Sequence, residues 1–138
     1  MVVAILLIGS SLSFAQCDKK VILTSTKTEH LGADSTVQRA EDERTEIVFD
    51  KTSITIKPGN EDHTMTGTIT SYTCNWTTPY KNGRMVLKVS LDNPDRGDKD
   101  VTITIEGKGG KITFLGEVDG RNDRKIRLAV EKFEEKGN

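Results

Sequence analysis

Apolar side chains recur at every second position through most of the chain beyond residue 16. The alternation is clearest in two segments, which carry Met85, Leu87 and Val89, and then Val101, Ile103 and Ile105. Successive side chains of a strand point to opposite faces, so a period of two predicts strands with one buried face. Such strands are typical of antiparallel sheets. No segment shows the period of an amphipathic helix.

Turn-forming residues divide this pattern into about eight strands. We predict them over residues 19–30, 36–49, 53–58, 64–76, 84–92, 100–107, 110–118 and 124–133. Asn82-Gly83 is typical of a two-residue type I′ hairpin, because both residues tolerate positive φ. The glycines of residues 107–110 indicate a second tight hairpin. Residues 31–45 have the weakest pattern and fit the tip of a long first hairpin.

Sequential antiparallel strands with short connections predict an all-β meander. A closed barrel is favoured over a two-sheet sandwich, because closure removes the exposed edges of the sheet. One irregularity is expected in the fourth strand. Apolar residues lie at odd positions up to Ile69 and at even positions from Tyr72. This switch predicts a bulge near Thr70-Ser71, or a strand that is buried on both faces.

The first residues have the pattern of a signal peptide. Val2 to Ile8 are all apolar, and Ser13 and Ala15 place small side chains before a cut after Ala15. This run is shorter than the about 20 residues that span a bilayer. We therefore expect a signal peptide at 1–15, an exported periplasmic or extracellular protein without a membrane span, and one domain at 16–138. The alternatives are a buried N-terminal element and a lipoprotein acylated at Cys17, although Gln16 is not the small residue that acylation requires.

The chain has two cysteines, Cys17 and Cys74. Export places them in an oxidising compartment, where a pair tends to form a disulfide. Two buried thiols or one reactive thiol are the alternatives. If strands alternate in direction, the start of the first and the end of the fourth lie at one end of the barrel. A disulfide there would close a loop of about 58 residues, which is worth on the order of 4 kcal/mol.

Charge argues against a nucleic-acid partner. The 20 basic and 21 acidic residues nearly balance, and no block of five or six like charges occurs. The most acidic stretch, Glu41-Asp42-Glu43, is interpreted as a solvated face. The threonines at 24, 26 and 28 are interpreted as outward-facing side chains of an exposed strand.

No motif indicates catalysis, a metal site or a cofactor, so we expect a protein that is not an enzyme. His30 and His63 are interpreted as exposed loop residues, and no serine lies in a nucleophile-elbow context. Two cysteines without nearby histidines do not make a zinc site. The acidic loop 92–100 fails as an EF-hand, because Pro94 and Arg96 fall on ligand positions. A less regular calcium site is the alternative there.

Tyr72 and Trp76 share parity near the end of the fourth predicted strand. They are our candidates for contacts with an apolar ligand at a barrel mouth. The alternative for both is ordinary core packing.

The eight-strand pattern, the short mature chain and the junction Ser13-Phe14-Ala15-Gln16-Cys17 resemble the lipocalin-like, calycin-type barrels and other small exported proteins of Gram-negative bacteria. This resemblance implies a barrel that holds a small apolar ligand. The chain has Val21-Ile22-Leu23 where lipocalins carry Gly-x-Trp, so no binding residue is carried over. The expectation is a non-enzymatic binding module. The alternatives are a protein-interaction or envelope-structural domain and, third, a small hydrolase or inhibitor.

Overall fold

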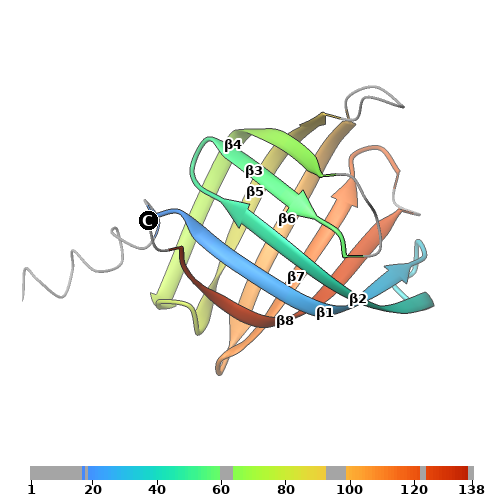
Figure 1. Cartoon of the computed structure of the whole chain (residues 1–138), viewed down its shortest axis with the longest axis horizontal. Helices are drawn as coiled ribbons and strands as arrows, with labels where there is room; N and C mark the ends of the chain where they lie inside the picture. The colour runs from blue at the N-terminus through green and yellow to red at the C-terminus, as the bar shows by residue number, and fades with distance from the viewer. Residues whose placement is uncertain (1–16, 18, 60–63, 93–98, 122–123, 137–138) are drawn as a thin grey trace, which may run out of the picture.

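A computed structural model shows a closed antiparallel β-barrel (Figure 1). It describes residues 17, 19–59, 64–92, 99–121 and 124–136. The strands formed by these residues are β1 (Val21–Leu31), β2 (Val37–Phe49), β3 (Ser53–Lys57), β4 (Met65–Thr78), β5 (Asn82–Asp92), β6 (Lys99–Lys108), β7 (Lys111–Val118) and β8 (Lys125–Glu135).

Each strand pairs with the next one in the sequence, and β8 pairs with β1 to close the barrel. The predicted meander is therefore confirmed as a barrel, and the sandwich alternative is wrong. Every strand begins and ends within two residues of its predicted bounds. The agreement follows from the period of two, because the apolar face of each strand must point into the barrel.

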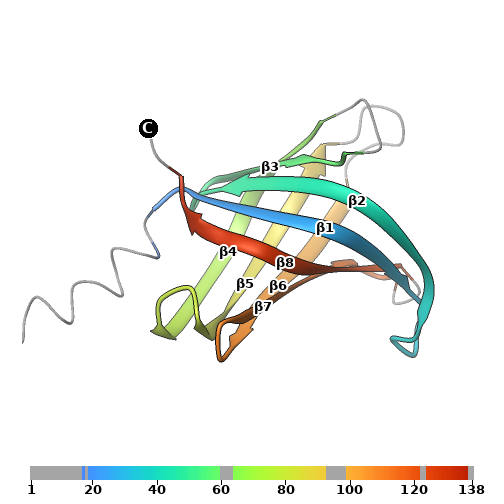
Figure 2. The ribbon, with the colours of Figure 1, turned by 60° about the horizontal axis from the view of Figure 1, so that its bottom comes forward.

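The two ends of the barrel differ. Because the strands alternate in direction, β1 begins and β8 ends at one end, which we call the closed end. The other end, where β1 ends and β2 begins, is called the open end; the hairpin between these two strands curves away from the barrel in Figure 2. The fully buried side chains nearest the closed end are large, and they include Leu23, Phe49 and Ile54.

An aromatic cluster covers the closed end. The Trp76 indole packs so tightly over two glycines that a Cβ on Gly83 would lie 2.7 Å from its Cε3, and one on Gly107 would lie 2.9 Å from its Cζ3. Phe133 lies 5.8 Å from Trp76 between ring centroids, and Tyr80 meets Phe133 edge-on at 5.0 Å. These rings replace the side chains that the two glycines lack.

The predicted bulge in β4 is confirmed. Ile69 pairs with Val89 and Ser71 with Lys88, so Thr70 is the extra residue. The bulge turns Tyr72 and the alternate residues that follow it toward the interior. A second irregularity lies in β1, where Ser25 and Thr28 pair with Val130 and Leu128 of β8, so that β1 has one extra residue between these two pairs.

The irregularity in β1 corrects the prediction for the threonines of this strand. Thr24 and Thr28 are 8% and 5% exposed, and only Thr26 of the three is exposed. Strict alternation would have placed all three on one outward face. The extra residue in β1 shifts the parity, and Thr28 then points inward.

The type I′ turn predicted at Asn82-Gly83 is wrong. Both residues belong to β5, and the chain reverses at residues 78–81, where the Lys81 amide donates to the Thr78 carbonyl at 3.1 Å. Tyr80 adopts a φ of 61°. Proline is favoured at the second position of such a turn, so Pro79 moves the reversal away from Gly83. The predicted tight hairpin near residue 109 is confirmed, with φ values of 60° at Gly109 and 88° at Gly110.

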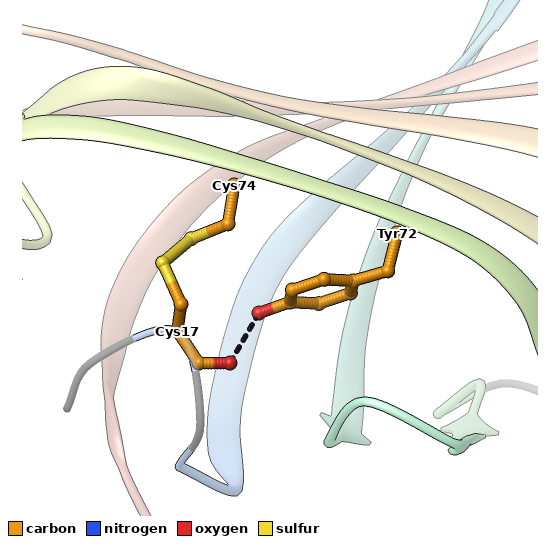
Figure 3. The surroundings of a disulfide bond; sticks show 3 residues. All are labelled: Cys17, Tyr72 and Cys74. Carbon is orange, nitrogen blue, oxygen red and sulfur yellow. Dashed lines mark hydrogen bonds between the residues drawn. A yellow bond between two sulfur atoms is a disulfide. The ribbon is translucent and has the colours of Figure 1, made fainter. Parts of the chain in front are cut away.

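A disulfide joins Cys17 to Cys74 at the closed end, as predicted (Figure 3). The Tyr72 hydroxyl donates a hydrogen bond to the Cys17 carbonyl, and this bond holds the segment before β1 against β4. The predicted signal peptide at 1–15 lies outside the described residues. Within the described part of the chain, there is no helix with the length and apolarity needed to cross a membrane.

Candidate functional site

A cavity of about 1020 Å³ occupies the barrel toward its open end. Side chains from all eight strands line it. It is therefore a property of the whole barrel and not of one loop. The large buried side chains nearest the closed end, Leu23, Phe49 and Ile54, do not line it.

One wall of the cavity is apolar. It is formed by Ile47, Val101, Ile103, Phe114 and Leu128, which are all buried. β6, β7 and β8 supply four of these five, because their inward positions carry only apolar residues or glycine in this part of the barrel. Such a wall favours a ligand with a substantial apolar part.

Two inward glycines show where the interior is filled and where it is empty. A Cβ on Gly67 of β4 would lie 2.7 Å from Val89 Cγ1 and 3.0 Å from Leu91 Cδ2. A Cβ on Gly116 of β7 would meet nothing closer than Phe114 Cε1 at 3.6 Å. The barrel is thus packed beside β4 and open beside β7, where Gly116 lines the cavity.

Polar residues beside the apolar wall come from β1 and β2, and β1 pairs with β8. Thr28, Glu43 and Thr45 are buried and line the cavity, and the Thr28 hydroxyl donates to Glu43 Oε1 at 3.1 Å. Glu43 and Thr45 share the parity of Ile47 in β2, which explains why they point inward. The prediction that Glu41-Asp42-Glu43 forms a solvated face is therefore wrong for Glu43, although Asp42 is exposed.

Charged side chains surround the cavity mouth. Arg39 Nε lies 2.9 Å from Glu41 Oε1, and Arg39 Nη2 lies 3.1 Å from His30 Nε2. On β8, Lys125 Nζ donates to the Ser35 hydroxyl at 3.2 Å. His30 lies within β1 and lines the cavity with a half-buried side chain, so its prediction as an exposed loop residue needs correction.

The two predicted ligand contacts lie elsewhere in the barrel. Tyr72 and Trp76 point inward at the closed end, and neither lines the cavity. Trp76 is 7% exposed, and its Nε1 has no hydrogen-bond partner among the described residues. The structure gives both residues packing contacts, and their role in ligand binding stays a prediction.

Tyr80 completes the closed end. Burial and, to a smaller extent, the nearby Glu135 carboxylate raise the pKa of Tyr80 to about 12. Its hydroxyl makes no hydrogen bond within 3.5 Å in the described part of the chain. This phenol therefore stays protonated at neutral pH and acts as a packing group.

The described residues contain no group of three or more His, Cys, Asp or Glu side chains that could hold a metal ion. His63 and most of the acidic loop 92–100 lie outside the described residues. The described contacts of His30 are those with Arg39 and Glu41. In the described part of the chain, no Ser, Thr or Cys side chain bonds to His30 as a nucleophile would.

Comparison of this chain with protein-family models, with curated proteins and with solved structures finds no match. The function therefore has to be inferred from the chain's own residues.

Proposed function

We propose that the protein is a non-enzymatic carrier that holds a small, mainly apolar ligand inside its barrel. The cavity is the observation that supports this proposal. Its volume of about 1020 Å³ is at the upper end of the range typical of ligand pockets, about 300–1,000 Å³. The combination of one apolar wall with a few buried polar groups is also typical of such pockets.

Export to the periplasm or the extracellular space is part of the proposal. The Cys17–Cys74 disulfide supports it, because disulfides persist in oxidising compartments. The N-terminal signal pattern supports it independently. A lipocalin-like carrier would combine these properties, and the closed eight-stranded barrel is compatible with that finer classification.

The alternative of an interaction or envelope-structural domain has less support. Every described strand is paired on both sides, so the barrel offers no edge strand to a partner. The exposed large hydrophobic residues among the described ones are Val37 and Ile126. Ile126 also lines the cavity.

The proposal is tested with N-phenyl-1-naphthylamine, an uncharged apolar dye whose fluorescence rises in an apolar site. We expect saturable binding to the native protein. Gly116→Trp places a large ring in the open part of the cavity and should weaken binding by at least about tenfold, or ~1.4 kcal/mol. Thr113→Trp is the matched control, since Thr113 points outward from the same strand.

Saturable binding that Gly116→Trp weakens and Thr113→Trp leaves unchanged would support the cavity as the binding site. The proposal would be contradicted if the native protein showed no saturable dye binding. It would also be contradicted if the Gly116→Trp and Thr113→Trp variants bound the dye with equal affinity.

A further inference from the structure

We infer that the ligand carries an anionic head group, such as a carboxylate, which binds Lys99 and Arg124 at the mouth of the cavity. This inference rests on the proposed ligand-binding function and adds the chemical class of the ligand. It starts from these two cationic side chains, which line the cavity and have no hydrogen-bond or ion-pair partner in the described part of the chain.

Lys99 continues the inward face of β6. It shares its parity with Val101 and Ile103, which are buried in the apolar wall, and the Lys99 side chain itself is half-buried. A lysine can bury its aliphatic stem against apolar neighbours while its ammonium group stays near water. A strand rises about 3.3 Å per residue, so Ile103 lies about 13 Å from Lys99 along β6, toward the closed end. The strand therefore presents an apolar surface that ends in a positive charge.

Arg124 lies on the same rim, two strands away from Lys99. Val118 of β7 lies between them, because it pairs with Val101 of β6 and its amide donates to the Arg124 carbonyl at 3.3 Å. Neighbouring strands are about 4.8 Å apart, so Arg124 is separated from β6 by about 10 Å across the sheet. Both side chains are long and both line the cavity. They can therefore contact one small anionic group beside Val118.

The space below this rim accommodates an apolar tail. Gly116 lies two residues before Val118 on the inward face of β7 and leaves the interior open there. Gly116 pairs with Ile103 of β6, and Phe114 follows on the same face. A ligand whose head group binds at the rim can thus place its tail beside Gly116, against Ile103 and Phe114. This arrangement fits a single-chain amphiphile.

Acidic side chains of the cavity present a rival, because they would favour a cationic head group. Glu41 is paired with Arg39, whose Nε lies 2.9 Å from Glu41 Oε1. Glu43 accepts a hydrogen bond from Thr28 and makes a further interaction. Both carboxylates therefore have partners within the protein. Asp92 also lines the cavity, but it is exposed to solvent. The half-buried charge without a partner is therefore the positive one on β6, and it favours an anionic ligand.

The test uses three probes with the same alkyl chain: decanoate, decanol and decylamine. Each competes with N-phenyl-1-naphthylamine at neutral pH for the native protein and for two double variants. The rim variant is Lys99→Gln, Arg124→Gln, which removes both charges and keeps polar side chains. The control variant is Lys108→Gln, Lys111→Gln. It removes the same charge from two exposed lysines at the closed end, and neither lines the cavity.

We expect decanoate to bind the native protein more tightly than decanol or decylamine. Exposure of the rim reduces the contribution of a charged hydrogen bond, so the rim variant should weaken decanoate binding by about tenfold. Decanol binding should change little, and the control variant should keep the native preference. Decanol or decylamine binding as tight as decanoate binding would overturn the inference, and so would a decanoate-to-decanol ratio that the rim variant leaves unchanged.

The outcomes separate this inference from the proposed function. Dye binding without displacement by any probe would overturn the inference alone, whereas absence of dye binding would overturn the proposed function. The comparison of the three probes on the native protein needs no variant. It therefore decides the inference even if the rim variant does not fold.

Discussion

Single carboxylates hold the turns of this barrel, and Asp50 after β2 illustrates how. Asp50 Oδ1 accepts hydrogen bonds from the Thr52 amide at 2.8 Å, the Ser53 amide at 3.0 Å and the Thr52 hydroxyl at 3.0 Å. The Thr52 amide is the main cause that lowers the pKa of Asp50 below its usual 3.8, although partial burial opposes it. The ionised carboxylate therefore stabilises the folded state.

We expect Asp50→Ala to lower the free energy of unfolding at neutral pH by about 1 kcal/mol, the usual net value of a lost hydrogen bond. Because the pKa is lowered on folding, this stabilisation is complete above the unfolded pKa of 3.8 and is lost as the pH falls through the folded pKa. Urea unfolding at neutral pH and well below pH 3.8 measures the difference. Asp50→Asn, which keeps an acceptor oxygen, should lose less stability and show little pH dependence. An Asp50→Ala penalty of equal size at both pH values would contradict the assignment.

At the scale of the strands, β4 and β7 differ in what their inward glycines face. Gly67→Ala forces its Cβ against Val89 and Leu91 and should destabilise the protein by about 1–3 kcal/mol, as overpacking usually does. Gly116→Ala has open space, and it also removes the entropic disadvantage of a glycine within a strand. Its stability should equal or exceed that of the native protein. Thermal unfolding of the two variants tests this, and similar losses in both would mean that the barrel is filled beside β7.

The strands could be predicted from the sequence, because period-two alternation is a direct consequence of a one-sided core. The bulge at Thr70 could be predicted from the parity switch between Ile69 and Tyr72. The turn before β5 could not, since it depends on the competition between Pro79 and the Asn82-Gly83 pair and on the packing of Trp76 over Gly83.

The site was less accessible from the sequence than the strands. Glu43 belongs to a charged run that resembles a solvated face. Extending the parity of Ile47 and Phe49 backward along β2 would have placed both Glu43 and Thr45 on the inward face. The alternation of apolar and polar residues does not predict the cavity, because Gly67 and Gly116 occupy similar inward positions in this pattern. Only three-dimensional packing shows that one is covered and the other is not.

At the scale of the whole molecule, the contacts that stabilise the barrel and the cavity that we propose as the binding site lie at different ends. The disulfide, the Tyr72 hydrogen bond and the Trp76 cluster lie at the closed end, whereas the cavity opens at the other. No residue of the disulfide, and none of the aromatic residues of the cluster, lines the cavity. The covalent link should therefore contribute to stability without contributing to ligand affinity.

This separation makes a final prediction. The disulfide spans a sequence separation of 57 residues, so the double variant Cys17→Ala, Cys74→Ala should lose up to about 4 kcal/mol of unfolding free energy. At a temperature where the variant is still folded, its affinity for N-phenyl-1-naphthylamine should match that of the native protein. Circular dichroism gives the folded fraction and dye titration gives the affinity. A folded variant with weakened dye binding would contradict this separation. It would show that loss of the disulfide at the closed end changes the position of the strands that line the cavity.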